Sequence, residues 1–145
     1  MKIVKNKHIG VYGIIIEKEK IVLIRKARGG YKGKLDLPGG GMEHKELPIE
    51  TLKRELMEEV GVDVIKEELF DVTSTNIKRQ MTNDIIEDLH HIGILYITKI
   101  QGELKNEADG HDSLGSRWYE INSLMKDELT PFAIYGLEKM GYKLH

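Results

Sequence analysis

The sequence contains no cysteine, only three prolines and a single tryptophan. The missing cysteine excludes disulfide bonds and thiolate metal sites, and it suits a reducing compartment. The apolar run that ends at Ile16 is too short to span a membrane, and it lacks the small-residue cleavage pattern of a signal peptide. We therefore expect a cytoplasmic protein with no membrane partner.

An excess of charge of either sign is also missing. The 22 lysines and arginines nearly balance the 24 aspartates and glutamates, which gives a net charge of −2. This balance offers no electrostatic reason to bind nucleic acid. A chain of 145 residues, 40% of them apolar, can bury a proper core. We expect one domain over residues 1–145 and no nucleic-acid partner.

Runs of β-branched and aromatic residues predict the strands. The runs at 8–17 and 21–27 are expected to pair as a hairpin, and a polar segment near 78–87 is expected to be mobile. Strands, a central helix and a terminal helix together predict an α/β (α+β) fold in which a mixed sheet lies between helices. The other expected elements are short strands at 35–38 and 116–124, longer strands at 62–75 and 88–100, and a helix at 131–140.

The clearest helix is predicted from Pro48 to about Val60. Proline suits its first turn, and Gly61 suits its C-terminal end. One face of this helix is apolar and is expected to join the core. That face consists of Ile49, Leu52, Leu56 and Val60.

Three glutamates gather on the same helix, at the border of its apolar face. Glu55, Glu58 and Glu59 stand at i, i+3 and i+4, where each like-charged pair costs roughly 0.2–0.5 kcal/mol. A solvated charged face would lie opposite the core and would usually mix both signs. A divalent cation prefers carboxylate oxygens and would turn this repulsion into attraction. The triplet alone also suits a solvated acidic face, so the flanking residues have to decide.

The segment PGGG, residues 38–41, comes shortly before this helix. Glycine tolerates positive φ and lets a ligand approach the backbone closely. Its carbonyl groups can bind a metal ion and its amides can contact phosphate. A tight turn without any ligand would need the same residues.

Residues 40–62 as a whole resemble the Nudix box. The family pattern is a glycine, five residues, a glutamate, seven residues, and then R-E-U-x-E-E-x-G-U, where U is a bulky aliphatic residue. This chain has Gly40, Glu46 and then RELMEEVGV at 54–62, so every specified position is filled. The late segment SLGSRWYEINSL also resembles a family strand.

The resemblance implies a Nudix fold in which the box forms a loop–helix–loop. It implies hydrolysis of a nucleoside diphosphate linked to another moiety, with Mg²⁺ as cofactor and Mn²⁺ as a substitute. The substrate would be a small nucleotide, and dimers are common in the family, so a homodimer is among the expectations. Carried over by position, the metal ligands would be Glu55, Glu58, Glu59 and the Gly40 carbonyl, while Arg54 would hold Glu55, Glu46 would support the loop, and Gly39 would shape the turn.

The general base and the substrate contacts stay open. The base would be a box glutamate or a later acidic residue, and among the later ones we favour Glu107 as an extra metal ligand or base. Two family markers of substrate class, a proline and a tyrosine, are absent from the window at 77–79. The later acidic candidates are Glu103, Glu107, Asp109 and Asp112, and the substrate-binding candidates are Arg25, Arg28, Gly39 and Gly40.

Two alternatives remain beside a small-nucleotide hydrolase. The first is removal of pyrophosphate from the 5′ end of RNA, against which the missing basic excess argues. The second is a nucleotide-sensing module that lacks turnover. A degenerate module would be expected to lose a box glutamate, and all of them are present here.

Overall fold

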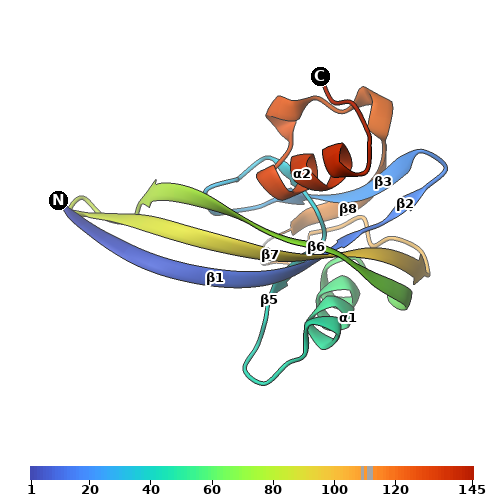
Figure 1. Ribbon diagram of the computed structural model, residues 1–145, viewed down its shortest axis with the longest axis horizontal. Coiled ribbons are helices and arrows are strands. Elements are labelled where there is room, and N and C mark those ends of the chain that lie inside the picture. The colour runs from blue at the N-terminus through green and yellow to red at the C-terminus, as the bar shows by residue number, and fades with distance from the viewer. Residues whose placement is uncertain (109, 111–112) are drawn as a thin grey trace.

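The structure, a computed structural model, describes residues 1–108, 110 and 113–145. Within these residues the chain forms two β-sheets and two α-helices (Figure 1). The first sheet has the strand order β5-β1-β7-β6, and the second joins β2, β3, β4 and β8. The elements are β1 (Lys2–Ile14), β2 (Ile16–Glu17), β3 (Lys20–Lys26), β4 (Leu35–Asp36), β5 (Gly39–Gly41), α1 (Pro48–Glu59), β6 (Asp63–Gln80), β7 (Ile85–Gln101), β8 (Ser113–Glu120) and α2 (Pro131–Lys139), with two 3₁₀ turns at Ile121–Ser123 and Lys126–Glu128.

The first sheet is mixed, as expected. β1 runs parallel to β7, while β5 and β6 pair in antiparallel fashion with β1 and β7. One end of this sheet, made by residues 2–9, 74–80 and 85–92, projects beyond the rest of the molecule as a three-stranded arm with the N-terminus at its tip (Figure 1). α1 and α2 lie on opposite sides of the sheet, which confirms the predicted layering.

The expected hairpin of residues 8–17 and 21–27 forms only in part. β2 pairs with β3 around a turn in which Lys18 and Glu19 both have positive φ. Residues before Ile15 leave this pairing and join β7 instead. The local pattern could not show this, because the partner strand lies far along the chain.

The prediction of a mobile segment at 78–87 is wrong. β6 continues to Gln80 and β7 begins at Ile85, so only a tight turn separates them. Opposite charges face each other across the two strands, and Arg79 Nε lies 2.8 Å from Glu87 Oε1. The polar residues that suggested mobility therefore hold the hairpin together. The predicted glycine turn is likewise a short strand, β5, paired with β1.

The helix α1 confirms its predicted bounds and its apolar face. Leu52, Leu56 and Val60 are fully buried and pack against Val11 and other residues of the strands. Leucine replaces the usual capping residue at position 47, and the Leu47 N–H donates to Glu50 Oε1 at 2.8 Å. This bond satisfies one exposed backbone donor at the helix start.

The helix α2 covers the other face of the first sheet. Its residues Phe132, Ala133 and Leu137 are buried with Tyr12 and Leu95. Among the described residues, no helix is long and apolar enough to cross a membrane.

Two glycines make room for the aromatic rings on this face. Gly10 and Gly93 lie side by side on β1 and β7. A Cβ atom at Gly93 would come within 2.7 Å of the Phe132 ring, and one at Gly10 within 2.4 Å of the Tyr12 hydroxyl. The rings therefore lie directly over the bare backbone, which fixes the position of Tyr12.

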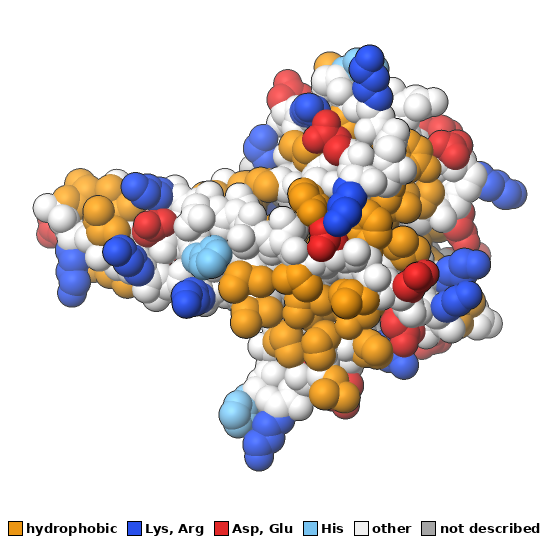
Figure 2. Space-filling model, viewed as in Figure 1, with side chains coloured by type: hydrophobic (Ala, Val, Ile, Leu, Met, Phe, Trp, Pro, Cys, Tyr) orange, Lys and Arg blue, Asp and Glu red, His pale blue; other side chains and the backbone are white. Residues whose placement is uncertain are grey.

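The two faces of the sheet differ in character. Figure 2 shows apolar side chains gathered between the sheet and α1. Exposed apolar residues on these strands include Ile9, Leu69 and Val72. Because side chains alternate along a strand, Arg79 and His8 point to the opposite face. That second face carries the polar cavity described below.

Gly93→Ala should destabilise the protein. The added methyl group overlaps the Phe132 ring, and overpacking of this kind costs about 1–3 kcal/mol. Urea unfolding of the variant would measure the loss. The double variant with Phe132→Leu should lose less than the sum of the single losses, because the two sites are in contact. Strictly additive losses would contradict this account.

Asp71→Asn should lower stability in a pH-dependent way. Asp71 accepts hydrogen bonds from Lys139 and Tyr135, and these contacts lower its pKa to about 2. The pKa of an aspartate in the unfolded chain is ~3.9, so the stabilisation is complete above that pH and is lost as the pH falls toward 2. The gap in Tm between wild type and variant should therefore close on acidification. Asp63→Asn, which removes an exposed carboxyl from the same strand, serves as control; a gap that does not change with pH would refute the assignment.

Candidate active site

The strand β5 is hydrogen-bonded to a buried glutamate at the C-terminal end of α1. The Gly39 N–H donates to Glu59 Oε1 at 2.9 Å, and Glu59 is only 3% exposed. Gly39 has φ of 145°, and a Cβ atom there would come within 2.1 Å of the Val11 carbonyl oxygen. Only glycine can hold this position, so the backbone amide stays available to the carboxylate.

Burial raises the pKa of Glu59 well above its usual range. The hydrogen bond from Gly39 opposes this shift, while the charges of Glu55 and Asp36 add to it and that of Lys26 opposes it. The second carboxylate oxygen of Glu59 has no hydrogen-bond partner among the described residues. No buried side-chain oxygen or nitrogen of the described residues lacks a partner, so this second oxygen reaches solvent and is open to a cation.

Gly40 brings Glu55 close to the same strand. A Cβ atom at Gly40 would come within 2.6 Å of the Glu55 carboxyl carbon. Glu55 is also close enough to Glu59 for its charge to raise the pKa of Glu59. The absence of a side chain at Gly40 is what allows this approach.

Arg54 organises the acidic residues around it. It contacts Glu46 through two bonds, Nε to Oε2 at 2.7 Å and Nη2 to Oε1 at 3.0 Å. Its Nη1 donates to Glu55 Oε1 at 2.9 Å and lies 3.4 Å from Glu58 Oε2. Its Nη2 also donates to the Gly41 carbonyl at 3.0 Å. One guanidinium thus ties the loop, the helix and β5 together.

The contact with Arg54 has a clear electrostatic effect on Glu46. Arg54 is the main reason that the pKa of Glu46 falls to about 2. Glu46 also accepts from the Thr51 hydroxyl at 2.8 Å and from the Glu43 N–H at 2.8 Å. Glu46 is therefore ionised and binds the loop to the helix.

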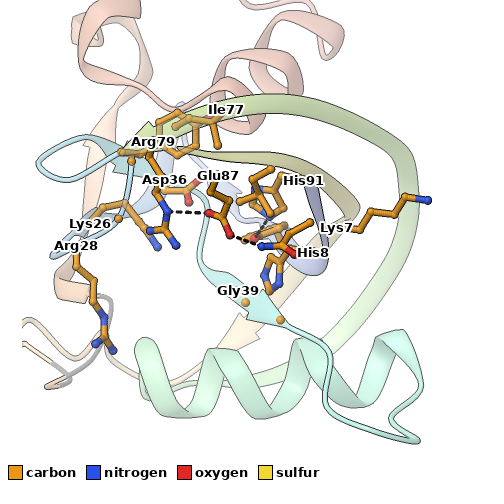
Figure 3. Close-up of a pocket in the computed structure, with 18 residues that line it drawn as sticks. Lys7, His8, Lys26, Arg28, Asp36, Gly39, Ile77, Arg79, Glu87 and His91 are labelled. Atoms are coloured by element: carbon orange, nitrogen blue, oxygen red, sulfur yellow. Dashed lines mark hydrogen bonds and ion pairs between the residues drawn. The ribbon is translucent and has the colours of Figure 1, made fainter. Parts of the chain in front are cut away.

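A cavity of about 590 Å³ opens on the other side of β5 (Figure 3). Its walls come from β1, β5, β6, β7 and the loop after β3. Four basic side chains line it, against two acidic ones, so it attracts anions. The lining includes Asn6, Lys7, His8, Tyr12, Lys26, Arg28, Tyr31, Asp36, Gly39, Gly40, Gly41, Ile77, Arg79, Glu87, Leu89 and His91.

Lys26 adds a positive charge to the wall of the cavity. Its charge lowers the pKa of both Glu59 and His91. Sequence reasoning missed it and selected its neighbour Arg25. A shift of register in the pairing of β3 with β8 falls between Ile24 and Lys26, and alternation alone could not reveal it.

His91 is one of two histidines on the cavity wall, and it is neutral near pH 7. Burial, together with the charges of His8 and Lys26, lowers the pKa of His91 to about 4. Its Nε2 lies 2.8 Å from the Tyr12 hydroxyl. The pair forms an uncharged polar wall beside the basic residues.

Three of the four predicted substrate-binding residues line the cavity, and the fourth does not. Gly39, Gly40 and Arg28 line the cavity. Arg25 lies outside its described lining and donates from Nη1 to the Gly33 carbonyl at 2.8 Å. Lys26 and Arg79 could have been found only from the pairing of their strands with strands distant in the sequence. A single sequence does not show this pairing.

The loop with the late acidic candidates returns to the end of α1. The Lys105 N–H donates to the Val60 carbonyl at 2.7 Å. Glu107 is exposed two residues further on, near this end of the helix. Asp109 and Asp112 lie outside the described residues. A role for Glu107 as metal ligand or base stays a prediction.

The donor set fits a hard divalent cation. Glu55, Glu58 and Glu59 supply only carboxylate oxygens, the ligand type that Mg²⁺ favours, and one oxygen of buried Glu59 is unpartnered. In the described part of the chain, no three acidic or histidine side chains converge tightly enough to enclose an ion. Arg54 holds Glu55 and Glu58 in this arrangement.

Comparison with known proteins shows the family of this chain. A model of the NUDIX domain matches residues 6–140, and the chain therefore belongs to the Nudix family. Hydrolases of this family generally use divalent metal ions.

Two relatives of known activity are similar in sequence. One is an ADP-ribose pyrophosphatase of Methanocaldococcus jannaschii, 33% identical over 119 residues, which cover 81% of this chain and 64% of that protein. The other is an 8-oxo-dGTP diphosphatase of Proteus vulgaris, 38% identical over 72 residues, which cover 48% of this chain and 63% of that protein. This chain thus spans less than two thirds of each relative.

Solved structures share the fold. The MutT NUDIX hydrolase of Burkholderia pseudomallei superposes with a TM-score of 0.74 at 24% identity, covering 91% of this chain and 96% of that one. A MutT protein of Bacillus halodurans gives a TM-score of 0.66 at 21% identity, covering 94% and 84%. These matches confirm the predicted Nudix fold.

Arg54→Met should lower the thermal midpoint. It removes the cation shared by three glutamates and leaves their repulsion uncompensated. Glu46→Gln should have a smaller effect, because Arg54 keeps its other partners. The double variant should lose less than the two single losses combined, as groups in one network do. An additive result in thermal unfolding would show that the network is not cooperative.

Proposed function

We propose that this protein hydrolyses a phosphoanhydride bond in a nucleoside diphosphate linked to another moiety, in a reaction that depends on Mg²⁺. The observation that carries the proposal is the buried Glu59 carboxylate, held by the Gly39 amide beside Glu55 at the edge of a basic cavity. The names of the two sequence relatives, which act on ADP-ribose and 8-oxo-dGTP, support the same reaction class.

Each part of the site has a role in this reaction. Glu55, Glu58 and Glu59 would hold the cation, and Mn²⁺ should be able to replace Mg²⁺. When bound, the cation neutralises charge on the diphosphate and lowers the pKa of a coordinated water. Arg54 keeps the glutamates in position and Glu46 keeps Arg54 in position.

The basic residues of the cavity would bind the substrate. Lys26 and Arg28 line the same cavity as β5 and carry positive charge, and the diphosphate would lie in this cavity. Their charge offsets the repulsion that an anionic diphosphate meets near the glutamates. A box glutamate or Glu107 would accept the proton of the attacking water.

Glu59→Gln should abolish most of the activity. The amide keeps the hydrogen bond from Gly39 but loses the charge, so turnover should fall on the order of 10²-fold or more. Phosphate and pyrophosphate release would be measured with Mg²⁺, Mn²⁺ or EDTA. The panel would include ADP-ribose, 8-oxo-dGTP, nucleoside triphosphates, nucleotide sugars and 5′-triphosphorylated RNA.

Glu68→Gln provides the matched control, because it removes an exposed carboxyl from β6. It should retain wild-type rates. Equal activity of Glu59→Gln and wild type would refute the metal role. Activity on RNA alone would favour the 5′-end reaction, and an absence of release from the whole panel would favour a sensing module.

A further inference from the structure

The far wall of the cavity carries a hydrogen-bonded row across three neighbouring strands. Glu87 of β7 accepts from Arg79 Nε of β6 at 2.8 Å and from Asn6 Nδ2 of β1 at 2.7 Å. The side chain of Glu87 is 9% exposed. The contact with Asn6, followed by that with Arg79, lowers the pKa of Glu87, so the carboxylate is ionised.

This row has unused hydrogen-bonding groups. Arg79 uses only Nε in the described structure, and both of its Nη atoms lack a partner there. Figure 3 shows its guanidinium directed into the cavity. Asn6 donates through Nδ2, and its Oδ1 has no partner among the described residues. A rigid donor fork and an adjacent amide oxygen therefore face the same space.

The charge of the row differs from that of the wall near β5. Arg79 and Glu87 neutralise each other, whereas Lys26 forms no ion pair with any described residue and its charge acts on Glu59 and His91. An anionic diphosphate would gain more beside Lys26. The Arg79–Glu87 pair suits an uncharged polar group, because its net charge is zero.

The order of donors and acceptors in the row is specific. Arg79 donates, while Glu87 and Asn6 Oδ1 accept. The edge of guanine offers an acceptor at O6 and donors at N1 and at the 2-amino group, which is the complementary order. Adenine has a donor at position 6 and an acceptor at N1, and would leave the row unpaired.

The surroundings of the row suit a flat base. Ile77 and Leu89 line the cavity beside it. Tyr31 lines it from the loop after β3 and bonds Thr75 of β6. Gly30 packs on Ile77, where a Cβ atom would come within 2.3 Å of the side chain. The loop therefore lies close over the strand at Ile77, and the apolar side chains of Ile77 and Leu89 offer a surface on which a base could lie.

We propose that Arg79, positioned by Glu87, determines base specificity and directs the enzyme to substrates that contain a guanine-type base. This inference rests on the proposed function for its kinetic readout, and a binding measurement tests it separately. Asn6 contributes the contact to the 2-amino group.

The kinetic test compares GTP, ITP and ATP. Wild type should prefer GTP to ATP in kcat/KM by about tenfold or more, with ITP between them. Arg79→Met should bring the ratio of GTP to ATP close to one, chiefly through the KM for GTP. Asn6→Ala should remove the difference between GTP and ITP. Lys78→Met, on the same strand with its side chain on the opposite face, should keep all ratios.

A second variant distinguishes a loss of base recognition from a loss of folding. Arg79→Lys keeps the charge beside Glu87 and loses the fork, so the base preference should fall while Tm stays near that of wild type. Binding of GMP and AMP, measured by calorimetry, should show the same Arg79-dependent preference.

The outcomes separate the two proposals. Loss of activity on GTP and ATP in equal measure in Arg79→Met would place Arg79 on a phosphate and overturn the inference. A wild type without base preference in either assay would also overturn it. Arg79-dependent preference for GMP without turnover of any triphosphate would support the inference and count against the hydrolase.

Discussion

The hydrogen bond from the Gly39 amide to the buried Glu59 carboxylate is the contact on which the site depends. It joins a strand of one sheet to the C-terminal turn of α1, and it requires that β5 approach the helix without side chains. Gly39 would otherwise meet the Val11 carbonyl, and Gly40 would meet Glu55. The clustered glutamates repel one another, and a strand of three glycines has no side chains to pack. The two features fit together because the glycines let the carboxylates approach the backbone, where a positive charge would be stabilised.

Arg54 compensates the negative charge of some of these glutamates and not of others. Its guanidinium satisfies Glu46, Glu55 and the Gly41 carbonyl at once, while Glu59 is left with the backbone alone. The charge in the cluster is therefore compensated unequally. The partly buried Glu46 and Glu55 have an arginine, whereas the more deeply buried Glu59 has only an amide and the charge of Lys26.

The sequence predicted the box and its helix because their spacing is local. The core face of α1 follows from residues within one short segment. The contact of Arg54 with Glu46 lies in the same segment, but the sequence had suggested Glu55 and not Glu46 as the partner of Arg54. The cavity was not predictable in the same way. Arg79 and Glu87 looked like part of a polar linker until pairing of β6 with β7 placed them opposite each other. Lys26 was hidden by a shift of register in β3. In each case the deciding contact is made by a strand that is remote or irregular.

The parallel pairing of β1 with β7 has a consequence for how the protein folds. Lys2 lies beside Ile85 and Ile14 beside Ile97, so this pairing closes a loop that contains the whole Nudix box. Loop closure of this length opposes early formation of the pair, and proteins rich in such non-local contacts fold slowly. We infer that during synthesis the helix with its glutamates can form well before the cavity wall, since β7 leaves the ribosome after α1. The acidic cluster would then exist for a time without the surface that brings a substrate to it, and completion of the arm would be the step that makes the chain competent to bind.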